Sequence, residues 1–180
     1  HIIDRIQEEF PDHNIIDEEA GVIDKGAEYT WVIDPIDGTS NFANSVPTYG
    51  VMIGLLHKDI PVAGAIAVPA FHQVCVAEKG SGAFLDGAKV MVTSEKSLLS
   101  TLIAYQIDGH QENPEITRDE CRILAEITLG VRNIRTAGSC FDWIMGAKGS
   151  FGGCLNRTSK IWDNVANQII IEEAGGLYTD

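Results

Sequence analysis

The chain has 180 residues and a mass of 19.5 kDa, with 26 acidic and 13 basic residues and a formal net charge of −13. Its 44% hydrophobic and 22% charged residues are typical of a globular protein, which excludes wholesale disorder. The acidity argues against direct nucleic-acid binding, which needs a basic surface, and it is compatible with carboxylates clustered around divalent cations. No stretch reaches the roughly 18–20 apolar residues of a membrane span.

The four cysteines lie far apart in the sequence, at Cys75, Cys121, Cys140 and Cys154. No pair has the Cys-x-x-Cys spacing of a zinc or thioredoxin-like motif, so we expect them to be reduced and mostly buried. The chain opens on a helical pattern and not on a basic region followed by an apolar one, so no signal peptide is recognised. We therefore predict a cytoplasmic protein without a membrane partner.

The first half of the chain predicts a helix followed by a mainly antiparallel sheet. Residues 1–10 carry apolar side chains at helical spacing, and Pro11 ends that helix. Short strands are expected at 14–17 and 31–34, with a glycine-containing loop between them. Residues 49–92 are typical of a meander, with β-rich runs separated by turn residues at 51–56, 62–68, 74–77 and 83–85.

In the second half, predicted strands alternate with predicted helices, which indicates an α/β lobe. The strands are expected at 101–106, 131–134 and 151–155, and the helices at 113–129, 139–147 and 162–174. We predict two lobes that share an interface, residues 1–97 and 98–180. The chain begins inside a helical pattern without Met and ends, at 176–180, on what looks like the opening of a strand. We therefore expect residues 1–180 to be part of a longer chain.

Residues 34–39 (Asp-Pro-Ile-Asp-Gly-Thr) are the most informative segment. Two carboxylates three positions apart follow a buried strand, and the proline fixes the backbone between them. Asp34, the Ile36 carbonyl and Asp37 can thus point to one place, and such oxygen ligands suit Mg²⁺, Mn²⁺ or Ca²⁺. Gly38 and Thr39 begin a predicted helix, whose free N–H groups can receive phosphate. The alternative is an ordinary turn, since Asp-Pro and Asp-Gly are common in loops.

Two further acidic positions can join this cluster. Glu18 and Glu19 also follow an apolar strand, although an exposed acidic pair is usually a solvated loop. Asp163 stands at a helix start, where the plain interpretation is a helix N-cap. The histidines at 57, 72 and 110 have no paired metal-ligand spacing and are expected at the surface. Asp142 is expected to support the helix that begins after Gly138.

Several segments together resemble a known family. Residues 31–42 (Trp-Val-Ile-Asp-Pro-Ile-Asp-Gly-Thr-Ser-Asn-Phe) resemble the first signature of the inositol monophosphatase family. Trp-Asp at 162–163, followed by Glu-Ala-Gly-Gly at 173–176, resembles the second. The acidic pair at 18–19, the hairpin at 80–87 and the turn at 135–139 match further family segments in the same order. On these motifs the chain is identified as a member of that family.

The resemblance implies a mixed α/β (α+β) fold, a layered αβαβα sandwich with an antiparallel meander sheet and a smaller α/β lobe. It also implies a Mg²⁺-dependent phosphomonoesterase that is inhibited by lithium and forms a homodimer. By resemblance, Glu18, Asp34 and the Ile36 carbonyl hold one ion. Asp34, Asp37 and Asp163 hold a second, and Glu18 helps with a weaker third. The ions are expected to be Mg²⁺, with Mn²⁺ as an alternative.

The resemblance also implies how the substrate is held. Gly38 and Thr39 bind phosphate through backbone N–H groups, and the Thr39 hydroxyl orients the attacking water. Backbone groups of Ser139 and Cys140, with Asp163, contact substrate hydroxyls. Where the family has a glutamate that contacts inositol, this chain has Asn156. The nearby Arg157 and Lys160 are alternative partners for a second phosphate or carboxylate, or solvated loop charges.

The leading hypothesis is therefore a phosphatase of inositol monophosphate or a related sugar phosphate. Fructose 1,6-bisphosphate, histidinol phosphate and 3′-phosphoadenosine 5′-phosphate remain as alternative substrates within the family. A regulatory binding protein on the same scaffold should have lost the metal carboxylates, and this chain keeps them. A factor acting with the transcription machinery is a third possibility, and the net charge argues only against its direct contact with nucleic acid. The resemblance further implies material upstream of His1, where the family carries a Thr-x-x-Asp-like segment, and downstream of residue 180.

Overall fold

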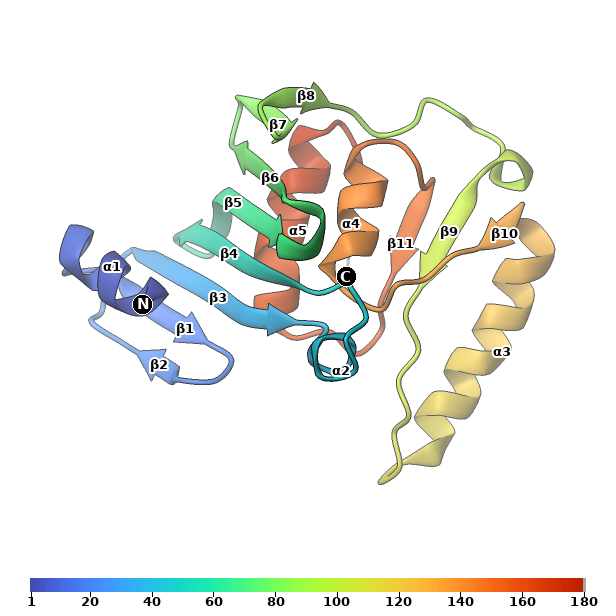
Figure 1. The fold of residues 1–180 in the computed structure, drawn as a ribbon, viewed down its shortest axis with the longest axis horizontal. Coiled ribbons are helices and arrows are strands. Elements are labelled where there is room, and N and C mark those ends of the chain that lie inside the picture. Colours follow the sequence, from blue (N-terminus) through green and yellow to red (C-terminus); the bar gives the residue numbers. More distant parts are fainter. Residues whose placement is uncertain (180) are drawn as a thin grey trace.

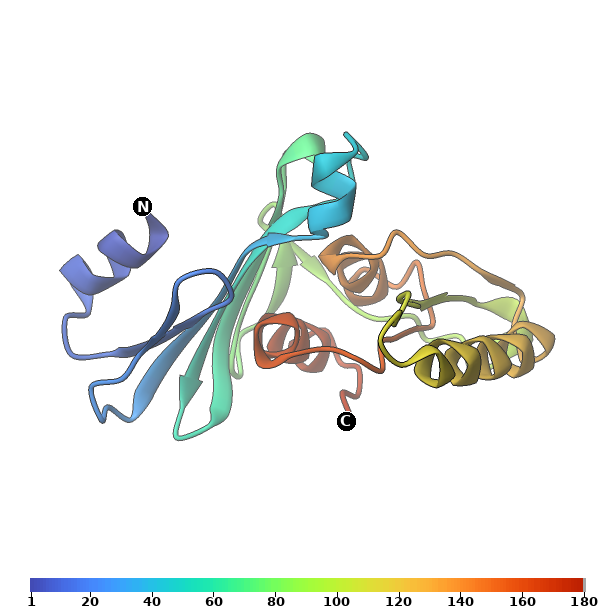
Figure 2. The ribbon, with the colours of Figure 1, turned by 90° about the horizontal axis from the view of Figure 1, so that it is seen from below.

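The computed structural model describes residues 1–179, which form a layered arrangement of helices and sheets (Figure 2). A helix at the N-terminal end lies on one side of a large sheet, two helices lie on the other side, and a small sheet and a long helix follow. The helices are α1 (Ile2–Glu9), α2 (Thr39–Ala43), α3 (Pro114–Gly130), α4 (Cys140–Ala147) and α5 (Ile161–Glu173). The order α1, large sheet, α4 and α5, small sheet, α3 confirms the predicted αβαβα fold class.

The large sheet has eight strands in the order β2-β1-β3-β4-β5-β6-β7-β8 (Figure 1). All neighbouring pairs are antiparallel except β1 with β3. The strands are β1 (Asn14–Asp17), β2 (Gly21–Ile23), β3 (Tyr29–Asp37), β4 (Gly50–His57), β5 (Ile60–Val68), β6 (Gln73–Glu78), β7 (Gly82–Leu85) and β8 (Ala88–Val90). The predicted meander is confirmed. The loop predicted after residue 17 is wrong at β2, a short and exposed edge strand that carries no alternating pattern.

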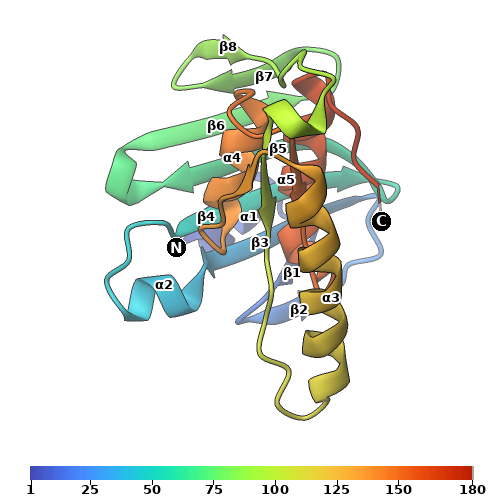
Figure 3. The ribbon, with the colours of Figure 1, turned by 90° about the vertical axis from the view of Figure 1, so that its right-hand side faces the viewer.

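The small sheet is parallel, with the order β10-β9-β11, and its strands come from the second half of the chain. They are β9 (Leu102–Tyr105), β10 (Asn133–Ile134) and β11 (Gly153–Leu155), each shorter than predicted. Helices α4 and α5 also belong to the second half but pack on the large sheet, so the two predicted lobes share an interface (Figure 3). The division at residues 97 and 98 stays a prediction.

Glycines allow α5 to lie directly on the large sheet. The residues of β4 alternate between buried and half-buried, and its buried side includes Gly54. A Cβ atom at Gly54 would lie 2.4 Å from Val165 Cγ1, and one at Gly64 would lie 2.6 Å from Ile169 Cγ2. Both distances are shorter than real Cβ contacts, so only glycine permits this spacing. The close approach brings the start of α5 next to the end of β3.

Some predictions made at the chain's periphery are wrong. Gly176 to Thr179 form no strand, because no described strand pairs with them; instead Tyr178 packs on Trp143 and donates to Asn164 Oδ1 at 2.6 Å. Asp180 lies outside the described residues. His110 is not a surface residue, because its side chain is only 25% exposed and lies against the fully buried Glu120.

The cysteines were predicted to be reduced and mostly buried, and the structure agrees with most of this. All four are free; Cys75 and Cys140 are buried, Cys154 is half-buried and Cys121 is exposed. Of the helices in residues 1–179, none combines the length and the apolar character needed to cross a bilayer.

Candidate active site

A break in the β3–β4 ladder turns two aspartates toward one cleft. The regular pairing of β3 with β4 stops at Asp34 and resumes at Asp37, so Pro35 and Ile36 form an irregularity in the strand. Proline has no N–H to give to a ladder and is tolerated at such a position. The Asp34 carboxylate accepts a hydrogen bond from Ile36 N at 3.0 Å, which fixes the bend. The local sequence therefore holds both carboxylates at the end of one strand.

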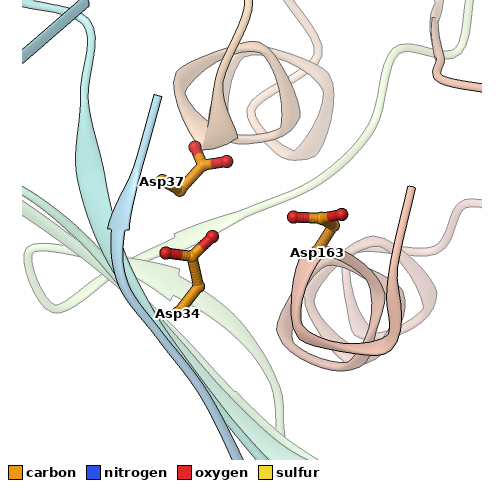
Figure 4. Close-up of side chains that lie close together, drawn as sticks. All are labelled: Asp34, Asp37 and Asp163. Atoms are coloured by element: carbon orange, nitrogen blue, oxygen red, sulfur yellow. The ribbon is translucent and has the colours of Figure 1, made fainter. Parts of the chain in front are cut away.

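A third aspartate comes from the first turn of α5. Ligand atoms of Asp34, Asp37 and Asp163 all lie within 4.8 Å of one another (Figure 4). Asp163 is the third residue of its helix turn and its Oδ2 accepts from Lys160 N at 2.5 Å. The predicted N-cap position is wrong, since Lys160 occupies it, but Asp163 does cap the helix start. One carboxylate oxygen of Asp163 thus caps the helix, which leaves the other to act as a ligand atom in the acidic cluster.

The three aspartates face one another, and the positive charge of Lys160 acts on Asp163, where it lowers the pKa. Burial, with the nearby charges of Asp37 and Glu18, raises the pKa of Asp34 to about 8. Burial also raises the pKa of Asp37 to about 6, against the hydrogen bond from Cys140 N. The pKa of Asp163 is raised by burial, with a smaller contribution from Asp108 across the cleft. A set of oxygen donors this costly to ionise together fits a divalent cation, which would supply further positive charge.

Glu18 lies at the edge of this cluster. It follows β1, lines the same cleft and faces Asp34, but it is not among the three aspartates that meet within 4.8 Å. Its neighbour Asp17 is buried and accepts hydrogen bonds from Glu19 N at 3.0 Å and Ala20 N at 2.8 Å. Asp17 thereby shapes the turn that presents Glu18. Sequence reasoning missed Asp17, although aspartate at the start of a turn is a recognisable signal.

The other side of the cleft is formed by the N-terminal ends of α2 and α4. Gly38 has φ of +78° and precedes α2, and a Cβ there would lie 2.9 Å from Ser139 Cβ. Only glycine meets both conditions without strain. The Thr39 hydroxyl donates to the Ile36 carbonyl at 3.0 Å, so it lies beside the aspartates. Backbone N–H groups at this point can bind an anion next to the carboxylates.

A model of the inositol monophosphatase family matches residues 1–180 of the chain. The chain belongs to this family. It is 34% identical over 174 residues to "Fructose-1,6-bisphosphatase/inositol-1-monophosphatase" of Aquifex aeolicus, which covers 94% of the chain and 64% of that protein. It is 33% identical to "Inositol monophosphatase 2" of Solanum lycopersicum, over 99% of the chain and 70% of that protein. The chain therefore spans about two thirds of the length of these relatives, and less than two thirds of the first.

Solved structures support the same assignment. An inositol monophosphatase from Anabaena superposes with a TM-score of 0.89 at 32% identity, covering 97% of this chain and 69% of that one. One from Thermotoga maritima gives the same TM-score at 30% identity, covering 99% and 67%. The inositol monophosphatase family is a family of metal-dependent phosphatases, and the acidic cluster of this chain could bind metal.

Family resemblance predicts substrate contacts from backbone groups of Ser139 and Cys140, and both residues also make hydrogen bonds within the protein. Cys140 does not line the cleft, and its N–H donates to Asp37 Oδ2, so in the structure it holds Asp37 in place. Ser139 does line the cleft, and its hydroxyl accepts from Phe141 N at 3.3 Å as the N-cap of α4. Asp142 accepts from Ala137 N and Gly138 N, which is the supporting role expected of it.

The cleft of this inositol monophosphatase family member measures about 450 Å³, and besides the carboxylates its lining includes a polar wall. That wall consists of Gln106, Asp108, Asn156, Thr158 and Ser159. No lysine or arginine of the described residues lines the cleft. Arg157 and Lys160 are exposed and line two adjoining pockets that share Ser159 and Asn164 with the cleft. Neither is among the residues that line the cleft itself, and their contact with a substrate stays a prediction.

Of the wall residues, sequence reasoning found only Asn156. Gln106 and Asp108 were missed although they directly follow the apolar strand β9. Polar residues just beyond the carboxyl ends of parallel strands are a common location for ligand contacts, and that signal could have found them. Their pairing with residues beyond β11 depends on strand order, which the sequence does not state.

Proposed function

We propose that this protein hydrolyses phosphate monoesters of polyols, of which inositol monophosphate is the expected example. The observation that carries the proposal is the meeting of Asp34, Asp37 and Asp163 beside the glycine-initiated start of α2. Oxygen ligands for cations and N–H groups for an anion then share one cleft. This is the arrangement that metal-assisted transfer of a phosphoryl group to water requires.

We propose Mg²⁺ as the cation, two or three ions, with Mn²⁺ as an alternative. Glu18, Asp34, Asp37, Asp163 and the Ile36 carbonyl are the residues that would hold it. When bound, the metal would neutralise the phosphate and supply a water of lowered pKa.

The protein's own groups have the remaining tasks. The N–H groups of Gly38 and Thr39 receive phosphate oxygens, and the Thr39 hydroxyl, next to the Ile36 carbonyl, orients the attacking water. Asp37 is held by the N–H of Cys140, so its carboxylate does not rotate away from the cleft. Ser139 and Asn156 line the part of the cleft where the alcohol would lie.

The charge of the cleft favours a monophosphate over the two alternative substrates that carry a second phosphate. A second phosphate, as in fructose 1,6-bisphosphate or 3′-phosphoadenosine 5′-phosphate, needs a positive partner, and none of the residues lining the cleft supplies one. The name of the Aquifex relative includes both activities, so fructose 1,6-bisphosphate belongs in any test. Inhibition by lithium and a homodimer remain predictions from the family resemblance, and a cytoplasmic location remains the prediction drawn from the sequence pattern.

Phosphate release by the full-length protein tests the function. We expect release from inositol 1-phosphate with Mg²⁺ and none with a chelator. Asp37→Asn should lower kcat by at least about a hundredfold because it weakens a metal ligand, while the amide oxygen can still accept from Cys140 N–H. Asp12→Asn makes the same charge change at an exposed turn and should leave kcat unchanged. Turnover that needs neither Mg²⁺ nor Asp37 would overturn the proposal.

A further inference from the structure

A hydrogen-bonded belt crosses the polar wall of the cleft and connects the ends of two strands. Gln106 follows β9 and Asn156 follows β11, and these strands are neighbours in the small sheet. Asn156 Nδ2 donates to Gln106 Oε1 at 2.9 Å, and Gln106 Nε2 donates to Ser139 O at 3.2 Å. Thr158 N donates to Asn156 Oδ1 at 3.0 Å, and the Thr158 hydroxyl donates to Asp108 Oδ2 at 3.3 Å.

Among the polar groups of the wall, Asp108 has the most hydrogen-bond acceptor sites that the belt does not use. The amide oxygens of Gln106 and Asn156 each already accept one hydrogen bond within the belt. Asp108 accepts only the bond from Thr158, through one of its two oxygens, and its side chain is exposed. An ionised carboxylate has about four acceptor sites and no donor. Asp108 can therefore accept several further hydrogen bonds from a molecule in the cleft.

The backbone of Asp108 is held by hydrogen bonds, which restricts where its free acceptor sites can lie. The Thr117 hydroxyl, in α3, donates to Asp108 O at 2.8 Å and accepts from His110 N at 2.9 Å. The loop after β9 is thus tied to α3 on one side and to the belt on the other. A carboxylate held in this way is positioned before a ligand arrives, which reduces the entropic cost of binding.

We propose that Asp108 determines specificity by accepting hydrogen bonds from hydroxyl groups of the alcohol part of the ester and by repelling esters that carry a second anionic group. The proposal rests on the proposed phosphatase function and names the substrate class of that site, a polyol monophosphate. It follows from the position of Asp108 in the lining of the same cleft as the metal carboxylates and from the absence of lysine and arginine among the residues that line this cleft.

Steady-state kinetics on three esters test it: inositol 1-phosphate, fructose 1,6-bisphosphate and phenyl phosphate, which has no hydroxyl to donate. The full-length protein is compared with Asp108→Asn, Asp108→Lys and the exposed, charge-matched controls Asp12→Asn and Asp12→Lys. We expect Asp108→Asn to raise KM for inositol 1-phosphate about tenfold more than KM for phenyl phosphate, because the remaining acceptor oxygen is neutral and the other oxygen is replaced by an NH2 group that cannot accept. We expect Asp108→Lys to raise kcat/KM for the bisphosphate relative to inositol 1-phosphate by about tenfold, since the repulsion becomes attraction.

The outcomes separate the two proposals. Equal changes of KM for inositol 1-phosphate and phenyl phosphate, or none, would overturn the role of Asp108 while the phosphatase function stands. A wild-type preference for the bisphosphate, or the same shift of preference in Asp12→Lys, would overturn it too. If none of the three esters, phenyl phosphate included, is hydrolysed with Mg²⁺, the phosphatase function fails and this inference fails with it.

Discussion

At the scale of single residues, Asp34 shows that ionisation of the site has a high free-energy cost when no cation is bound. The side chain is only 2% exposed and lies next to two other carboxylates. Its hydrogen bond from Ile36 N offsets only part of the cost of ionisation. The protein therefore stores unfavourable electrostatic energy at the point where a metal ion would relieve it.

The stability of the metal-free protein should consequently fall as pH rises. The pKa of Asp34 is raised to about 8 in the folded state from an ordinary value of 3.8, so the folded state binds more protons than the unfolded state between these values. The free energy of unfolding in chelator should thus decrease between about pH 5 and pH 8. Asp34→Asn should flatten this slope, and Mg²⁺ should restore stability at pH 8. Chemical unfolding at several pH values measures it, and equal slopes for wild type and Asp34→Asn would contradict the explanation.

At the scale of elements, the packing of α5 on β4 and β5 determines where Asp163 lies. Gly54 touches Val165, which follows Asp163 by two positions in the same helix. The glycine thus determines how closely the helix packs on the sheet. This packing distance in turn determines the distance between Asp163 and Asp34. Packing and the metal site are connected through one contact.

Gly54→Ala should therefore affect both stability and metal binding. The added methyl group would meet Val165 and push α5 outward, and overpacking of this kind costs about 1–3 kcal/mol. We expect a lower free energy of unfolding together with weaker Mg²⁺ binding in calorimetric titration. Gly130→Ala, at the end of α3 with open space around it, is the matched control. A destabilised variant with unchanged Mg²⁺ affinity would show that the glycine does not position the site.

Helix α3 carries a second unusual element-scale feature, a buried carboxyl group. Glu120 has no exposed surface, and no described residue donates a hydrogen bond to either of its carboxylate oxygens. His110 Nε2 is 3.7 Å away, which would be an ion pair only with a protonated imidazole. A buried polar group without a partner is destabilising.

Replacing that group should stabilise the protein. We expect Glu120→Met, which keeps the length of the side chain, to raise the free energy of unfolding at pH 8 by about 1–2 kcal/mol. Glu126→Met changes an exposed position of the same helix and should alter it by less than about 0.5 kcal/mol. Denaturant unfolding compares the two, and a Glu120→Met variant less stable than wild type would show that the carboxylate has a partner.

At the scale of the whole molecule, local patterns were enough for most helices and strands, the family resemblance was needed for the layers, and neither gave the contacts between them. The helices and most strands could be predicted because each has its own periodicity and its own turn residues. Asp34, Ile36 and Asp37 could be predicted as a group because they lie in one short segment. The burial of Glu120 could not be predicted, because glutamate is ordinarily solvent-facing, although this one shares a helix face with Ile116 and Ile123. Asp108 and Thr158 meet only because β9 and β11 are neighbours.

The bond from Cys140 to Asp37 joins residues 103 positions apart, and Asp163 follows later still on α5. A ribosome delivers these segments in order, so the acidic turn at residues 34–37 leaves the exit tunnel long before its partners exist. Until α5 has been translated and has settled on Gly54 and Gly64, the growing polypeptide lacks the third aspartate. The acidic cluster, and with it the proposed activity, should accordingly be completed late in protein synthesis and in a single event.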